Sequence, residues 1–148
     1  MTTTIIEANE NHIEAVAPLF DHYRIFYKQE SDEQAAKKFL LERIQKNESI
    51  VFVAFIGEVA VGFTQLYTSF SSVSLQAVFI LNDLYVKPTS RGKGVGEALL
   101  NRAKELCRER NYKGLALETG VKNPAQQLYE KLGWEKDTDC FHYFWTSK

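Results

Sequence analysis

The feature that most constrains the fold is the stretch DLYVKPTSRGKGVGEALL, residues 83–100. An apolar run typical of a β-strand ends at Pro88, three alternate glycines follow, and an amphipathic helical pattern begins behind them. Glycines let backbone approach a ligand closely, and the free N–H groups of a first helical turn favour anions. Arg91 and Lys93 add positive charge. The stretch therefore predicts an anion-binding turn, with pyrophosphate as the expected ligand. The alternative is a turn whose glycines only allow helix and sheet to pack closely.

The whole chain predicts the element order β-α-α-β-β-β-α-β-α-β-β. A strand-helix-strand unit inside an otherwise antiparallel run indicates a mixed sheet with helices on its faces, so the fold class is α/β. Asn11 with Glu14, and Ser31 with Gln34, are typical of helix capping boxes. The expected strands are Thr3 to Ala8, Ile50 to Ile56, Val59 to Tyr67, Leu75 to Lys87, Gly114 to Thr119 and a closing pair within Trp134 to Thr146, with Thr68 to Ser74 as a polar turn.

Composition narrows the function classes. The 148 residues fit a single domain, 1–148, and are 45% hydrophobic and 25% charged. A net charge of −1 gives no general attraction to nucleic acid or to an anionic membrane. No apolar run is long enough to span a bilayer, and the first residues lack the pattern of a secretory signal. The two cysteines form no metal motif or disulfide framework, the three histidines show no metal spacing, and we expect a cytoplasmic protein without a metal.

Other phosphate-binding motifs fit the glycine stretch less well. A P-loop requires GxxxxGK followed by Ser or Thr, which is absent here. A dinucleotide fingerprint requires GxGxxG, and the last glycine comes one place early. Glu118 ends the next predicted strand, as that fingerprint requires, so a dinucleotide-binding redox module remains an alternative.

The run from Arg91 to Gly96 is similar to the (Arg/Gln)-x-x-Gly-x-(Gly/Ala) signature of the GNAT superfamily of acyl-CoA-dependent N-acetyltransferases. The strand LNDLYV, residues 81–86, and the block NPAQQLYEKLGW, residues 123–134, extend the resemblance over nearly the whole chain. Within the superfamily the pattern resembles diamine (polyamine) and small-amine acetyltransferases. The resemblance implies a mostly antiparallel central sheet that splays at a parallel junction, with helices on both faces. It also implies acetyl transfer from acetyl-CoA to a small primary amine in a ternary complex, with a catalytically silent acyl-CoA sensor as the alternative.

The same resemblance assigns the cofactor residues. The family holds the cofactor pyrophosphate on the glycine loop and pairs the pantetheine arm with the end of the preceding strand. An asparagine at the start of the later helix also touches the cofactor. The residues that match are Leu84, Tyr85, Val86, Arg91, Gly92, Lys93, Gly94, Val95, Gly96 and Asn123.

Two side chains are predicted to move protons. A lysine-like amine has a pKa of about 10.4, so a base must take its proton before attack. Asp83 is the candidate base, although it can also pair with a cation or cap a turn, and the diamine enzymes carry Glu where this chain has Asn82. Tyr129 matches the family tyrosine that protonates the departing thiolate, and its alternative role is packing.

An aromatic and acidic wall is the candidate acceptor site. Tyr23, Phe26 and Tyr27 stand near Glu30, Asp32 and Glu33, and aromatic faces beside acids suit a cation. Tyr23 and Tyr27 also fit the core stripe of a helix. The aromatic tail, residues 141–145, is expected to form a closing strand or to pack on a second subunit in a homodimer.

Overall fold

The computed structural model describes residues 2–148, and these form two compact units. The first unit ends at Glu118 and contains the sheet, and the second runs from Thr119 to Lys148. No helix of the described chain is both long and apolar enough to cross a bilayer.

The first unit is built on a five-stranded mixed sheet in the order β1-β2-β3-β4-β5. Neighbours are antiparallel except at the junction of β4 and β5, which is parallel. This confirms the predicted mixed sheet with one parallel junction. The strands are β1 (Thr3–Glu7), β2 (Ser49–Ile56), β3 (Val59–Ser71), β4 (Gln76–Val86) and β5 (Leu115–Ala116).

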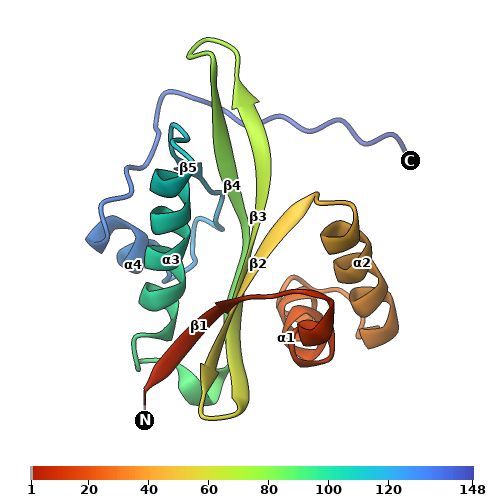
Figure 1. The fold of residues 1–148 in the computed structure, drawn as a ribbon. Coiled ribbons are helices and arrows are strands. Elements are labelled where there is room, and N and C mark those ends of the chain that lie inside the picture. Colours follow the sequence, from red (N-terminus) through yellow and green to blue (C-terminus); the bar gives the residue numbers. More distant parts are fainter. Residues whose placement is uncertain (1) are drawn as a thin grey trace. The chain divides into compact units, whose positions relative to one another are not determined.

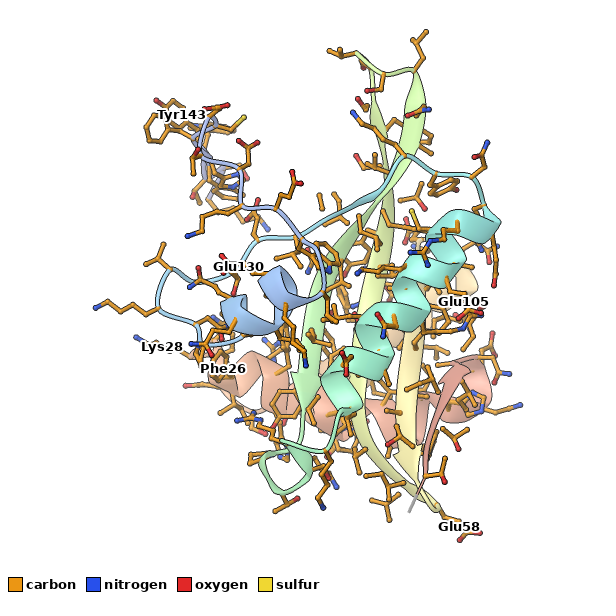
Figure 2. All side chains as sticks on the ribbon, turned by 90° about the vertical axis from the view of Figure 1, so that its left-hand side faces the viewer. Phe26, Lys28, Glu58, Glu105, Glu130 and Tyr143 are labelled. Carbon is orange, nitrogen blue, oxygen red and sulfur yellow. The ribbon has the colours of Figure 1, made fainter. Side chains whose placement is uncertain are left out.

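Helices cover both faces of this sheet. Figure 1 shows α1 (Ile13–Phe26) and α2 (Glu33–Gln45) on one face and α3 (Val95–Glu109) on the other. Figure 2 looks onto α3, which lies across the near face, with Glu58 at the turn between β2 and β3. Phe63 is buried in the core beneath α1, and the centroid of its ring lies 5.9 Å from that of Phe20. Apolar side chains of α3, Val95, Leu99, Leu100 and Ala103, are completely or almost completely buried.

The hairpin of β3 and β4 is longer than the sequence predicts. Residues 68–71 continue β3 and pair with β4, so the polar turn shrinks to residues 72–75. Serine-rich sequence has low strand propensity, and pairing with the apolar end of β4 overrides it. Figure 1 shows the hairpin extending past the helices, and Val73 and Leu75 at its tip are almost fully exposed.

The helix starts differ from the predicted capping boxes. Asn9, rather than Asn11, caps the 3-10 turn before α1, in a capping box with His12. Asp32, rather than Ser31, caps α2 by accepting from the N–H of Ala35. The Ser31 side chain is held away from that role at the buried carboxylate of Asp21, to which its hydroxyl donates at 2.6 Å. A tertiary contact thus decides which residue caps α2.

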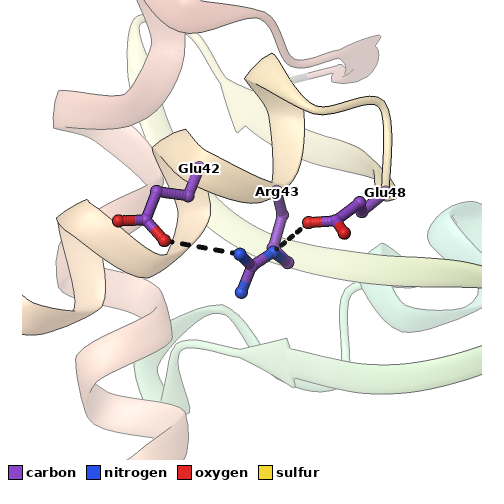
Figure 3. A network of polar contacts seen from close by, with 3 residues as sticks. All are labelled: Glu42, Arg43 and Glu48. Atoms are coloured by element: carbon purple, nitrogen blue, oxygen red, sulfur yellow. Dashed lines mark hydrogen bonds and ion pairs between the residues drawn. The ribbon is translucent and has the colours of Figure 1, made fainter.

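The end of α2 is tied to the start of β2 by charges. The Arg43 guanidinium lies 2.9 Å from Glu48 and 3.4 Å from Glu42 (Figure 3). The same guanidinium lies over the Phe39 ring, 4.6 Å from its centroid. These contacts fix Arg43 beside the sheet face that α1 and α2 cover.

The second unit contains α4 (Gln126–Lys131). Gly133 ends the helix with a φ of 89°, and the N–H of Trp134 donates to the carbonyl of Tyr129, as is typical of a glycine C-terminal cap. The predicted closing strands are wrong, because residues 134–148 form no strand in the described chain. The aromatic tail is exposed, and a hairpin with no sheet to join is only marginally stable in water.

Candidate active site

The site begins at a β-bulge in β4. Gln65 of β3 pairs with Asp83, but the next residue, Leu66, pairs with Leu81, so Asn82 is an extra residue in β4. Directly paired residues share a face of the sheet, and consecutive residues of β3 face opposite sides. The bulge therefore moves Asp83 to the face opposite that of Leu81. Asp83 and its partner Gln65 face α1, because Gln65 shares its face of β3 with Phe63, and Phe63 packs against Phe20 of that helix.

Asp83 is a buried carboxylate surrounded by neutral partners. It is 3% exposed. Its Oδ2 accepts from Gln65 Nε2 at 2.5 Å, and its Oδ1 accepts from Asn82 Nδ2 at 2.8 Å. Thr64 fixes the backbone by donating to the Asp83 carbonyl at 2.8 Å. Among residues 2–148, no Lys or Arg forms an ion pair with this carboxylate.

Burial raises the pKa of the Asp83 carboxyl, and hydrogen bonds from Asn82, Gln65 and Tyr23 offset only part of the rise. Burial, and then the nearby Asp83 charge, also raise the pKa of Tyr23. The same two causes raise the pKa of Tyr67 to about 12, against a smaller opposing effect of Arg43. Asp83 is therefore a carboxylate with increased proton affinity beside two tyrosines that stay protonated at neutral pH.

The structure brings one of the predicted acceptor-site residues directly to Asp83. The Tyr23 hydroxyl donates to the Asn82 carbonyl at 3.0 Å. The ring of Tyr27 lies 5.0 Å from that of Tyr23, and Phe26 lies 5.2 Å from Tyr27 and is 58% exposed. The three aromatic residues thus form a continuous row from the buried carboxylate to the surface.

The predicted acids have other roles in the structure. Asp32 caps α2, and Glu33 lies in the first turn of that helix. Glu30 is exposed, and its carbonyl accepts from Arg24. The negative charge at the candidate acceptor site therefore comes from Asp83 rather than from these three residues.

The glycine loop has a backbone conformation that favours glycine. Gly92 and Gly94 have φ values of 76° and 80°, where other residues are strained. A Cβ added at either would meet no atom within 4 Å, so the space above this backbone is open. Gly94 caps the 15-residue helix α3 without a side-chain hydrogen bond. Arg91 is anchored by donating from Nε to the Val86 carbonyl at 2.9 Å.

The remaining loop residues differ in exposure. Lys93 is exposed, whereas Val95 is buried and offers only its backbone to a ligand. Gly96 lies in the first turn of α3. This helix start, which has no side-chain hydrogen bond at its cap and has open space and exposed cations beside it, fits a pyrophosphate group.

The predicted cofactor strand is the second half of β4. β5 pairs with β4 only at Phe79 and Ile80. Within the described sheet, the edge of β4 from Leu81 to Val86 therefore has no strand partner on that side. Leu84, Tyr85 and Val86 lie along this edge, and all three are partly buried. An open edge of this kind can accept an extended ligand with amide groups.

Gly62 of β3 packs against residues on both sides of the glycine loop, and it was not among the predicted site residues. A Cβ here would lie 2.9 Å from the Tyr85 carbonyl oxygen, and 3.2 and 3.3 Å from side-chain atoms of Val95 and Leu99. Glycine thus allows β3, β4 and the start of α3 to approach one another.

The second unit holds the other two predicted site residues. The Asn123 side chain accepts from the N–H of Ala125 at 2.9 Å, so it shapes the turn before α4, whose N-cap is Ala125. Tyr129 lies within α4 and is 9% exposed, and its ring lies 6.1 Å from that of Trp134.

Sequence reasoning missed Gln65 and Tyr67. Both lie in β3 on the Asp83 face, and Gln65 is fully buried. A glutamine among the apolar and β-branched residues of the expected strand is the signal that could have identified it. In the described part of the chain, no cluster of His, Cys, Asp or Glu could hold a metal.

Comparison with known proteins identifies the class of this fold and site. The model of the Acetyltransferase (GNAT) family matches residues 14–134, and the chain belongs to that family. It is 45% identical over 140 residues to the "Uncharacterized N-acetyltransferase YhfO" of Bacillus subtilis (strain 168), covering 94% of each chain. It is 30% identical to a "Probable acetyltransferase" of Haemophilus influenzae, covering 85% of this chain and 95% of the other. A solved structure described as a probable acetyltransferase superposes with a TM-score of 0.91 at 38% identity, over 98% of both chains.

The protein is therefore a GNAT-family N-acetyltransferase. Members of this family use acetyl-CoA as the acetyl donor. The resemblance seen in the sequence is confirmed at this level, and so is the predicted GNAT fold.

Proposed function

We propose that this enzyme transfers the acetyl group to a primary amine of a small molecule, polyamine-like or amino-acid-like, by direct transfer in a ternary complex. The observation that carries the proposal is Asp83. It is a buried carboxylate with neutral partners, and a row of aromatic side chains leads from it to the surface. Such a site attracts a cation and can then take a proton from it.

Asp83 acts as the general base. At neutral pH roughly one lysine-like amine in a thousand is unprotonated, given a pKa of about 10.4. Burial raises the proton affinity of Asp83, which brings the pKa of the carboxyl closer to that of the amine. One proton leaves the ammonium nitrogen and joins an Asp83 oxygen, and the neutral amine is then a nucleophile.

The glycine loop holds the donor. When bound, acetyl-CoA supplies the acetyl thioester. Backbone N–H groups at Gly92, Gly94 and Gly96 would face its pyrophosphate, with Arg91 and Lys93 adding charge. Leu84, Tyr85 and Val86 present the open edge of β4 to the amide-bearing arm, and an N–H there would polarise the thioester carbonyl.

Residues of the second unit complete the assignment. The Tyr129 hydroxyl would protonate the departing thiolate and would then take the second proton that the attacking nitrogen loses, and Asn123 would contact the cofactor. The block match at residues 123–134 supports both roles. Tyr23, Phe26 and Tyr27 contact the acceptor. Holding amine and thioester together supplies much of the rate enhancement, because positioning alone can lower a barrier by several kcal/mol.

The proposed setting is the reducing cytoplasm, without a nucleic acid or membrane partner. The net charge of −1 and the exposed, unpaired thiol of Cys140 are consistent with it. We also infer that a homodimer can form, and the exposed aromatic tail supports this inference.

The test is CoA release from acetyl-CoA with spermidine, putrescine, lysine, an aminoglycoside and a basic peptide. Turnover on a small amine supports the proposal. Turnover on the peptide alone rejects the small-molecule acceptor, and CoA binding without turnover supports the sensor. Stabilisation by NAD(P) but not by CoA would favour the redox module.

A further inference from the structure

Gln65 is a fully buried amide that uses only one of its two ends. Its Nε2 donates to Asp83 Oδ2 at 2.5 Å, and the side chain has no exposed surface. Its Oε1 is buried and has no hydrogen-bond partner among the described residues. Buried polar atoms are nearly always paired, so an unpaired oxygen beside a titrating carboxyl requires an explanation.

The hydrogen-bonding chemistry of Asp83 and Gln65 explains the unpaired oxygen. An ionised carboxylate can only accept hydrogen bonds, so it needs the amide N–H of Gln65. A protonated carboxyl instead carries an O–H that must donate, and an amide offers an acceptor at its other end. Half a turn of the Gln65 amide exchanges its donor for its acceptor at the same place.

Resting on the proposed function, we propose that Gln65 is a positioning residue that pairs with Asp83 in both of its protonation states. Its Nε2–H donates to the carboxylate before the reaction. After Asp83 has taken the amine proton, the amide turns and Oε1 accepts from the new O–H of Asp83. The unpaired Oε1 is thus reserved for the protonated acid. No other bond changes in this step, and the proton later leaves from the same Asp83 oxygen.

The surroundings of Asp83 assign this task to Gln65 rather than to the other amide. Asn82 also donates to Asp83, but it is exposed, so water can replace its hydrogen bonds. Gln65 is sealed from water and its contact with Asp83 is the shortest of the carboxylate. Of these two amides, only Gln65 therefore bears the free-energy cost of an unpaired buried group.

The other titratable groups near Asp83 come from three elements. α1 contributes Tyr23, with His22 against the ring of Tyr85, and β3 contributes Tyr67. α2 contributes Arg43, whose charge acts on Tyr67. Both tyrosines stay neutral at physiological pH, so neither gains or loses a proton while Asp83 titrates between neutral and acid pH.

The direct experiment is an NMR pH titration of the wild-type protein. The 13C signal of the Asp83 carboxyl and the 15N side-chain signal of Gln65 are followed in one sample. We expect both to change with the same midpoint, and we expect the Gln65 change to disappear in Asp83→Asn. A Gln65 amide that stays constant while Asp83 titrates overturns the inference.

A variant tests how the Gln65 amide affects the titration midpoint of Asp83. Gln65→Met keeps an unbranched side chain of similar length but has no amide, so both forms of Asp83 lose a partner. The bond to the ionised carboxylate is charge-assisted and stronger than the bond to the neutral acid, so the Asp83 titration midpoint should move upward. The acidic limb of the kcat/KM profile should move in the same direction, with a loss of up to roughly 100-fold at neutral pH. Thr64→Val is the matched control, because it removes a buried hydrogen bond to the Asp83 backbone only, and we expect its Asp83 midpoint to be unchanged.

These readouts separate the two proposals. An Asp83 midpoint that is equal in Gln65→Met and wild type overturns the role of Gln65, even in an active enzyme. Full activity in Asp83→Asn overturns the base assignment, while a shared wild-type titration of Asp83 and Gln65 would still stand. If Gln65→Met does not fold, the wild-type titration alone decides.

Discussion

Replacing Asp83 by Asn tests the buried base with little change in shape. Oδ1 can still accept from Asn82, and the new amide nitrogen can donate to the unpaired Oε1 of a turned Gln65. No cation is left unpaired, because no Lys or Arg of residues 2–148 forms an ion pair with Asp83. The substitution therefore removes the proton acceptor while the fold should remain intact.

The expected kinetic loss is large and depends on pH. A positioned general base contributes roughly 10²–10⁴-fold, or about 3–5 kcal/mol of activation free energy. Without the base, the enzyme must wait for amine that is already neutral, a fraction that rises about tenfold per pH unit below the amine pKa of about 10.4. In CoA-release assays from pH 7 to 10, log(kcat/KM) of Asp83→Asn should rise with a slope near one. Activity within about twofold of wild type at pH 7 would refute the base assignment.

Stability gives the same variant a second signature. Burial raises the pKa of Asp83 above its ordinary value of 3.8, so the folded state binds its proton more tightly than the unfolded chain does. Its stabilising effect is present at low pH and is lost as the pH rises through the folded pKa. Asp83→Asn should therefore melt higher than wild type at pH 7, and this gain should disappear below about pH 3.8. A lower melting temperature at pH 7 would contradict this assignment.

Asp21→Asn is the matched control, because Asp21 is the other buried aspartate. Although burial opposes it, hydrogen bonds from Ser31 and the Asp32 N–H, with the charges of Arg24 and His22, lower the pKa of Asp21 overall. Its stabilising effect is therefore present above about pH 3.8 and is lost as the pH falls through the folded pKa. Asp21→Asn should melt lower than wild type at pH 7 and retain activity per folded molecule.

Three further variants test other parts of the site. Tyr129→Phe should lower kcat by roughly 10²-fold with acetyl-CoA affinity retained in calorimetry; an unchanged kcat would assign Tyr129 to packing. Gly94→Asp should leave the fold intact by circular dichroism and weaken acetyl-CoA binding by at least roughly tenfold, because it places a negative charge where phosphate is expected; unchanged affinity would reject the loop assignment. Gly62→Ala should destabilise the fold by about 1–3 kcal/mol in denaturant titrations, because its Cβ would lie 2.9 Å from the Tyr85 carbonyl oxygen. An unchanged denaturation midpoint would contradict that packing.

Local patterns predicted the elements that carry the glycine loop. The strand before the loop and the buried stripe of α3 follow from residue type and spacing. The strands expected at Ile50 to Ile56 and Val59 to Tyr67 are also joined by a short turn, in which Gly57 has a φ of 63°.

Long-range contacts decided what the sequence could not predict. Ser31 is a good capping residue by type, but the Asp21 carboxylate, which is remote from the start of α2, takes its hydroxyl. The bulge at Asn82 has no local sequence signal, because it depends on how β4 pairs with β3. Asp83 could therefore be identified as a candidate, whereas the face that it occupies and its contact with Gln65 could not.

The most direct test of the central claim is the stoichiometry of acetyl transfer. CoA release with the best amine of the panel is measured while the products are identified by mass spectrometry, with a parallel reaction lacking amine. We predict one N-acetylated small amine per CoA released and little release without amine. CoA release without an acetylated amine, or acetylation confined to the peptide, would contradict the proposed function.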